Sequence, residues 1–211
     1  EQYAHPLTPS YIELLLPLLG STSETIRVSA ATALAAGVRQ LELPAEVLLM
    51  QLIRLYAENV PAVAAAAAQA GAPHLASGGS AVASAGKGKG EQKGPKDTTS
   101  SLRIGVAETL QATAEGKTLS DDDVLAVFKF LLARGLVDPN ADVRAQMVQA
   151  GVDIINSHSD VSIKRLLPQL EEALTSTDQK LREGVVVLLG AVGRHMPAGS
   201  RRAGHGQPHQ A

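Results

Sequence analysis

The sequence predicts an all-α solenoid of about four helix pairs, and three observations carry this prediction. First, hydrophobic residues make up 45% of the chain, whereas aromatic residues make up only 2%. A core of Leu, Val and Ala suits closely packed helices, because sheets concentrate β-branched and aromatic residues. Second, one template with helical spacing occurs four times. Third, the template returns about every 40 residues once one low-complexity segment is set aside, as in solenoids with two helices per repeat.

Each copy of the template begins with an aliphatic residue and an arginine, followed by small or apolar residues at spacings of three and four. These spacings place the apolar residues on one stripe of a helix, so each copy predicts the second helix of a hairpin. The template arginines are Arg27, Arg103, Arg144 and Arg182. They are separated by steps of 76, 41 and 38 residues.

Residues 61–97 account for the long first step. The segment is rich in Ala, Gly, Ser and Lys and has no apolar periodicity, which predicts a disordered insertion inside one repeat. Without its 37 residues the first step becomes 39. The expected organisation is one repeat and the first helix of the second (1–60), the insertion (61–97), the remaining repeats (98–196) and a disordered tail (197–211).

An apolar first helix is expected before each template helix. These helices are expected over Tyr11–Leu19, from Leu43 to about Val60, from Ser120 onward, and over 162–174. Ser120 is expected to cap its helix, with Asp121, Asp122 and Asp123 in the first turn, where the helix dipole favours acidic residues.

A capping residue is expected six positions before each template arginine. These residues are Ser21, Asp97, Asp138 and Ser176. Glu24 and Gln179 lie three residues after Ser21 and Ser176, which fits two capping boxes. Pro139 suits the first position of a helix. The caps, the aliphatic–Arg pairs and the period near 40 together indicate HEAT repeats.

Composition narrows the function classes. The formal charge of −2 gives no general attraction to nucleic acid or anionic membranes, and the absence of cysteine excludes disulfides and thiolate chemistry. No run reaches the roughly 18 apolar residues of a membrane span, and no signal peptide follows Glu1. We expect a cytoplasmic chain that is part of a longer protein or a processed product.

Two motifs in the insertion invite a functional interpretation. Lys87, Lys89, Lys93 and Lys96 could contact RNA phosphates, but no aromatic residue is interleaved to stack on bases, so a solvated linker is preferred. Gly86 and Lys87 do not form a phosphate loop, because Ala81 and Gly88 occupy positions that require Gly and Ser or Thr.

Other chemistry-bearing residues are also expected to be structural. Asp121 to Asp123 point in different directions on a helix, and the adjacent residues 157–160 (Ser-His-Ser-Asp) cannot form a catalytic triad. No histidine precedes Glu, and His205 and His209 lie in a Gly/Pro-rich tail, so no metal site is expected. The template arginines are expected to form a structural ladder, each bonding carbonyls or an acid in the turn of the neighbouring repeat. We therefore predict no catalytic, cofactor-binding or metal-binding residue.

Four segments show a more specific similarity. They are Leu52–Tyr56, Asp138–Arg144, Leu166–Glu172 and Val185–His195. These segments resemble the eukaryotic general-control translational activator, a very large ribosome-associated HEAT protein that helps the amino-acid-starvation kinase act on initiation factor 2. The resemblance covers roughly residues 7–60 and 98–196 and does not extend to the insertion or the tail. The kinase-binding region of that family lies beyond this stretch, so no functional residue follows from the match.

The resemblance implies a non-catalytic scaffold whose partners are proteins, with the ribosome and a protein kinase among them. It implies no small-molecule substrate, cofactor or membrane. The alternative is a generic HEAT adaptor, such as a transport receptor or phosphatase scaffold, because periodicity and capping support both equally. We also expect two or more aliphatic side chains of residues 185–192 to stay exposed, because the apolar run covers more of the helix than one neighbour buries.

Overall fold

The structure is a computed structural model and describes residues 8–41, 43–61, 99–158 and 160–195. Within these ranges all regular structure is helical. The helices form successive pairs, each with a first helix, a turn and a second helix, and four pairs can be followed through the described residues. The prediction of an all-α solenoid of about four helix pairs is confirmed.

The first helices begin and end close to the expected positions. They are α1 (Thr8–Leu15) with the 3-10 helix η1 (Leu16–Gly20), α3 (Ala45–Glu58), α6 (Asp121–Phe130) with the π-helix η2 (Leu131–Gly135), and α8 (Asp160–Leu174). The second helices are α2 (Glu24–Gln40), α5 (Ser100–Glu115), α7 (Ala141–Ser157) and α9 (Gln179–His195).

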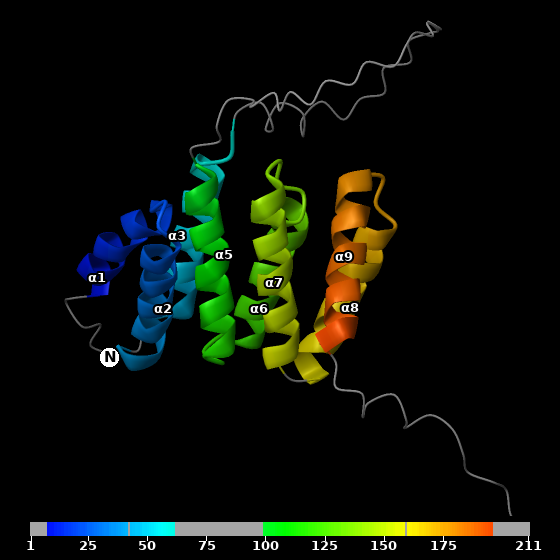
Figure 1. Cartoon of the computed structure of the whole chain (residues 1–211). Helices are drawn as coiled ribbons and strands as arrows, with labels where there is room; N and C mark the ends of the chain where they lie inside the picture. Colours follow the sequence, from blue (N-terminus) through cyan, green and yellow to red (C-terminus); the bar gives the residue numbers. More distant parts are fainter. Residues whose placement is uncertain (1–7, 42, 62–98, 159, 196–211) are drawn as a thin grey trace, which may run out of the picture.

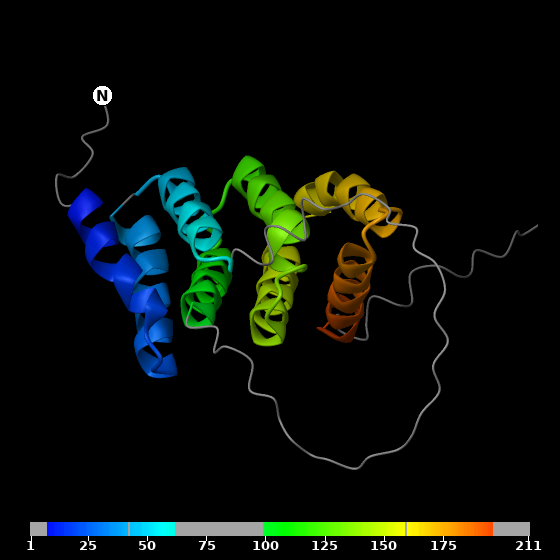
Figure 2. The same ribbon diagram turned by 90° about the horizontal axis from the view of Figure 1, so that it is seen from above.

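The helices form two layers. The second helices stand side by side in the order α2, α5, α7 and α9, with the first helices behind them (Figure 1). Seen from above, both layers run along the same row, from α1 and α2 at one end to α8 and α9 at the other (Figure 2). Each pair therefore packs mainly against the pairs before and after it, as expected of a solenoid.

The core lies between the two layers and is mainly aliphatic. Its fully buried side chains include Leu34, Leu48, Leu52, Val106, Leu110, Phe128, Leu131, Met147, Ile154, Val185 and Leu188. They come from both helix layers and from all four pairs, so one continuous core runs the length of the stack. Burial of such side chains contributes about 1.5–3 kcal/mol each, which makes this core the main source of stability.

Every second helix begins three residues before its template arginine. The first residues are Glu24, Ser100, Ala141 and Gln179. The N-terminal caps therefore stand four residues before the arginine, not six. Asn140 accepts hydrogen bonds from the backbone N–H groups of Asp142 and Val143, and Asp178 accepts from those of Lys180 and Leu181.

The predicted caps at Ser21, Asp138 and Ser176 are wrong for a common reason. Each of these side chains accepts a hydrogen bond from the N–H two residues later, which forms a turn before the helix begins. The predicted capping box at Ser176 is also wrong, since the Gln179 side chain bonds Glu183 instead. Pro139 precedes the first helical turn rather than opening it.

Ser120 behaves as predicted. Its hydroxyl accepts from the Asp123 N–H at 3.2 Å, and the Asp123 carboxylate accepts from the Ser120 N–H at 3.0 Å, which makes a reciprocal capping box. Asp122 makes an ion pair with Arg165 of the next first helix at 2.7 Å. These contacts support a structural role for the acidic first turn.

The two helices of the second pair are joined through a segment outside the described residues. Thr99 and Arg103 both donate hydrogen bonds to the Asn59 carbonyl, at 2.7 and 2.8 Å. These two bonds thus hold the start of α5 against the end of α3, on the two sides of residues 62–98. Nearly all of the predicted insertion, the predicted cap Asp97 and the tail at 197–211 lie outside the described residues.

Replacement of Asn140 by Ala should lower the free energy of unfolding by about 1 kcal/mol, because two N–H groups of α7 lose their acceptor. Chemical denaturation monitored by circular dichroism measures this difference. Ser176→Ala is the matched control and should have a clearly smaller effect, since the Ser176 side chain bonds only one N–H before α9 begins. An equal loss in both variants would contradict the revised cap positions.

Deletion of residues 62–96 should change the free energy of unfolding by less than about 1 kcal/mol. The bonds from Thr99 and Arg103 to Asn59 already hold both flanks together, and loop-closure entropy depends only weakly on loop length. Thermal and urea unfolding of the full and shortened chains provide the comparison. A larger loss of stability would mean that the deleted residues pack against the stack.

Candidate interaction surfaces

Three of the template arginines bond the turn that precedes their own helix. Arg27 donates to the Ser21 carbonyl at 3.0 Å, and Arg182 donates to the Ser176 carbonyl at 2.6 Å. Arg144 donates to the Asp138 carbonyl, also at 2.6 Å. In each case the acceptor lies six residues earlier, so the repeated spacing noted in the sequence reflects this bond. These bonds close the turns between paired helices, which confirms the structural role of the arginines. The expected carbonyl acceptors in the neighbouring repeat are wrong for these three bonds, since each acceptor lies in the turn of the arginine's own pair.

Arg103 makes the most extensive polar contacts among the template arginines. Its guanidinium meets the Asp138 carboxylate through two bonds, Nε to Oδ2 at 2.8 Å and Nη2 to Oδ1 at 3.2 Å. Both side chains are completely buried. Its Nη1 atom donates to Thr99 Oγ1 and to the Asn59 carbonyl. Arg103 thus connects α5 to the turn of the following pair and to the end of α3.

Tyr56 completes this buried group from α3. Its hydroxyl donates to Asp138 Oδ2, and its ring packs edge-on against Phe130 at a centroid distance of 5.1 Å. Burial raises the pKa of Tyr56 far above its ordinary value, and the hydrogen bond to Asp138 raises it further. Tyr56 therefore remains a hydrogen-bond donor throughout the physiological pH range.

A second cross-repeat contact joins α2 to α5. The Arg27 guanidinium lies 3.5 Å from the Glu108 carboxylate, and both side chains are about nine-tenths buried. Burial raises the pKa of Glu108, while the positive charge of Arg27 opposes this shift. The pair is longer and less completely bonded than Arg103–Asp138, so we expect it to hold the repeats together less strongly.

Two glycines allow neighbouring pairs to approach closely. A Cβ at Gly105 would collide with the Leu19 carbonyl, and a Cβ at Gly184 would lie 2.9 Å from the Leu136 carbonyl. Gly105 and Gly184 stand two residues after the arginines of their own helices. Leu19 and Leu136 stand eight residues before the arginines of the preceding pairs, Arg27 and Arg144. The same packing therefore joins the first pair to the second and the third pair to the fourth.

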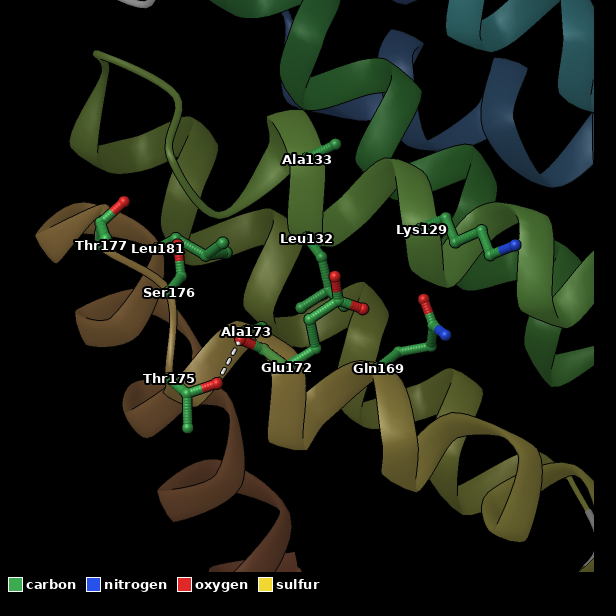
Figure 3. A pocket seen from close by; sticks show the side chains of 10 residues that line it. All are labelled: Lys129, Leu132, Ala133, Gln169, Glu172, Ala173, Thr175, Ser176, Thr177 and Leu181. Atoms are coloured by element: carbon green, nitrogen blue, oxygen red, sulfur yellow. Dashed lines mark hydrogen bonds between the residues drawn. The ribbon is translucent and has the colours of Figure 1, made fainter. Parts of the chain in front are cut away.

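A groove opens between the third and fourth pairs, with a volume of about 630 Å³. Its lining residues are Lys129, Leu132, Ala133, Gln169, Glu172, Ala173, Thr175, Ser176, Thr177 and Leu181. Figure 3 shows these side chains around the space between η2 and the turn that joins α8 to α9. Apolar, amide, hydroxyl and charged groups meet here, which suits contact with a polypeptide segment. The groove is the first candidate interaction surface.

The outward side of α9 is the second candidate surface. Val186 is 59% exposed, Val187 is 54% exposed and Leu189 is 38% exposed. The prediction that at least two aliphatic side chains of residues 185–192 remain exposed is confirmed. Contiguous apolar surface of this kind commonly marks a site of protein association.

The sequence motifs with apparent chemistry do not converge on a site. Ser157 ends α7 and Asp160 begins α8, while His158 Nδ1 lies 2.9 Å from the Ile154 carbonyl. In the described ranges no three His, Asp or Glu residues are grouped in a way that could hold a metal ion. Helices long and apolar enough to cross a membrane are likewise absent from these ranges. Residues 86–96, His205 and His209 lie outside them.

Sequence reasoning missed Tyr56, which bonds Asp138, and Glu108, which pairs with Arg27. Tyr56 and Glu108 carry no local motif, because their role depends on contacts with residues about 80 positions away. The groove was also not predicted, since it arises from the spacing of two helix pairs. Gly105 and Gly184 each stand two residues after a template arginine. This shared position in the sequence could have predicted the close packing between pairs.

Replacement of Asp138 by Ala should lower the free energy of unfolding by about 3–5 kcal/mol, because the buried Arg103 charge loses its counterion. The double variant Arg103→Met/Asp138→Ala should recover part of this loss, as no buried charge then remains. Urea denaturation of both variants measures the effect. Arg54→Ala is the control and should have a far smaller effect, because the Arg54–Glu58 pair is exposed to solvent. Equal losses for Asp138→Ala and Arg54→Ala would contradict the assignment.

The raised pKa of Glu108 predicts a pH effect on stability. The folded chain binds the Glu108 proton more tightly than the unfolded chain, so this group lowers stability as pH rises between the two pKa values. The stability of the native chain relative to Glu108→Gln should therefore fall as the pH rises above the ordinary glutamate pKa of about 4.3. Urea denaturation at a series of pH values tests it, with the exposed Glu115→Gln as control. A relative stability that rises with pH would contradict the prediction.

Comparison with known proteins identifies a family of HEAT-repeat proteins. A family described as "Stalled ribosome sensor GCN1, HEAT repeats" matches residues 1–194. The eIF-2-alpha kinase activator GCN1 of Saccharomyces cerevisiae is 34% identical over 197 residues, which cover 90% of this chain and 7% of that protein.

Two further relatives match about half of the chain. Protein ILITYHIA of Arabidopsis thaliana is 39% identical over 100 residues, covering 44% of this chain and 4% of the relative. The stalled ribosome sensor GCN1 of Homo sapiens is 30% identical over 99 residues, again covering 44% of this chain and 4% of the relative. No significant match to a solved structure was found.

The chain thus spans less than a tenth of the length of these relatives. The family match begins before the first described helix and continues through nearly all of α9. The stacked helix pairs agree with the HEAT repeats that its description names. This chain belongs to the GCN1 HEAT-repeat family.

Proposed function

We propose that this chain is a non-catalytic protein-interaction scaffold within a ribosome-associated, cytoplasmic regulator that activates the eIF-2-alpha kinase. The observation that carries the proposal is the family match over residues 1–194, together with relatives named as a kinase activator and a stalled ribosome sensor. The partners we propose are the ribosome and a protein kinase. The longer protein that contains such a segment would bind them.

The architecture supports a scaffold role. A stack of helix pairs presents long surfaces on both layers, and each pair is held by its neighbours rather than by a ligand. The groove beside Leu132 and Leu181 combines apolar and polar side chains, whereas the exposed side of α9 is apolar, and a protein surface can contact both. The most completely bonded polar group, Arg103 with Asp138, is fully buried and therefore serves the fold. We also propose the division into repeats, insertion and tail at residues 60, 97 and 196.

Replacing the matching segment of the yeast relative with this chain tests the proposal. The chimaera should restore phosphorylation of eIF-2-alpha during amino-acid starvation in cells that lack the native activator. It should also sediment with ribosomes in a sucrose gradient. Immunoblots of phosphorylated eIF-2-alpha and of the gradient fractions measure both properties.

Two variants sharpen this experiment. Asp138→Ala should reduce both readouts together, because it weakens the stack as a whole. Glu172→Lys changes the charge of the groove without touching the core, so a selective loss of one readout would assign the groove to that partner. A chimaera that accumulates normally but neither joins ribosomes nor restores phosphorylation would contradict the proposal and favour a generic adaptor.

A further inference from the structure

The position of Tyr56 in the second pair recurs in the third pair. Tyr56 stands eleven residues after Ala45, where α3 begins, and Leu132 stands eleven residues after Asp121, where α6 begins. The two residues therefore occupy the same turn of the first helix in successive pairs. Tyr56 reaches across to the third pair, whereas Leu132 lines the groove that faces the fourth pair.

The two contacts of the Tyr56 hydroxyl also have counterparts one pair later. The hydroxyl donates to the Asp138 carboxylate and lies 3.3 Å from the Arg134 carbonyl. The template arginines of the third and fourth pairs are 38 residues apart. The same step leads from Asp138 to Ser176. It also leads from Arg134 to Glu172. Ser176 and Glu172 both line the groove, which therefore lies where Tyr56 makes its contacts at the preceding junction.

Shorter side chains leave this position open between the third and fourth pairs. Leu132 has no ring and no hydroxyl, and Ser176 is shorter than the aspartate at the preceding junction. Ala133 and Ala173 add two more small side chains to the walls. The resulting volume of about 630 Å³ lies within the range of about 300–1,000 Å³ that is usual for ligand sites. Both pairs that form the walls belong to the described residues, and the space admits an aromatic side chain.

Two charged side chains border this space. Lys129 lies at one side of the groove near Gln169, and Glu172 lies between Lys129 and Thr175 (Figure 3). Both charged residues are exposed, and within the described ranges neither charged group has a hydrogen-bond or ion-pair partner. A carboxylate can accept a phenolic hydroxyl, as Asp138 does, and an ammonium group attracts a carboxylate. The groove thus offers an acceptor for a tyrosine and a separate positive charge.

We propose that this groove binds an extended polypeptide segment of a partner protein that carries a tyrosine and, two positions away, an acidic residue. The tyrosine ring packs between Leu132 and Leu181, its hydroxyl donates to Glu172, and the acidic side chain meets Lys129. Side chains two positions apart in an extended segment lie on the same side, about 7 Å apart. Lys129 precedes Leu132 by three residues, about 4.5 Å along the helix, so its long side chain reaches this distance. This inference rests on the proposed role as an interaction scaffold.

The experiment is a nuclear magnetic resonance titration of the full chain with the capped pentapeptide Asp-Gly-Tyr-Gly-Asp. Acidic residues on both sides of the tyrosine bring one of them to Lys129 in either chain direction. The peptide should shift the amide signals of groove residues in a saturable way. Exchange of its tyrosine for phenylalanine should raise the Kd at least about fivefold, because the hydrogen bond to a charged group is lost. A Lys-Gly-Tyr-Gly-Lys peptide should bind more weakly than the acidic peptide, and Lys129→Glu should reverse this order.

Two matched substitutions on the same helical segment locate the site. Ala133→Trp fills the groove from an exposed position and should abolish binding of every peptide. Ala126→Trp is exposed, lies seven residues earlier and does not line the groove, so it should bind like the native chain. Glu172→Ala should bind the tyrosine and phenylalanine peptides equally. Circular dichroism should show unchanged helix content in all variants, since the substituted residues are exposed.

Three results would overturn the inference. The first is an acidic tyrosine peptide that shows no saturable binding, and the second is binding that persists in Ala133→Trp. The third is a phenylalanine peptide that binds the native chain as tightly as the tyrosine peptide. These measurements use the purified chain alone, so they are independent of the chimaera. A chimaera that restores phosphorylation while the chain binds no peptide would overturn this inference and leave the proposed function standing.

Discussion

The buried ion pair between Arg103 and Asp138 is the contact on which the middle of the stack depends. Removal of two charges from water is costly, and a buried pair is tolerated only when the remaining donors and acceptors are satisfied. Here the guanidinium also bonds Asn59 and Thr99, and the carboxylate accepts from Tyr56 and from the Asn140 N–H. One network therefore fixes the end of α3, the start of α5 and the turn before α7.

The position of this network explains its importance. The first and second pairs are joined by Leu19 on Gly105, and the third and fourth by Leu136 on Gly184. The junction between the second and third pairs has Gln146 in place of the glycine. At this junction the ion pair and the Gln111–Gln146 hydrogen bond take the place of the leucine–glycine packing found at the other two junctions. Arg103 also bonds Asn59 and Thr99, which flank the long connection between α3 and α5, so the same network holds these two helices in register.

The architecture followed from the sequence because helix periodicity and repeat spacing are local properties. The four template arginines predicted the second helices, and each helix begins at the same distance from its arginine. The role of the residue six positions earlier was misjudged. A Ser or Asp can either cap a helix or close a turn two residues before it, and both require the same residue types. Tyr56, Glu108 and the groove depend on contacts between pairs, which no local pattern in a single sequence encodes.

Native-state hydrogen exchange tests the central claim most directly, namely that the ion pair couples the two halves of the stack. If Arg103 and Asp138 join the second pair to the third, amides of α5 and α7 should share one opening free energy, the highest in the chain. The Asp138→Ala variant should lower protection in both helices together, with α5 affected as strongly as α7. Separate opening of α5 and α7 in the native chain, or a loss confined to α7 in the variant, would contradict the account.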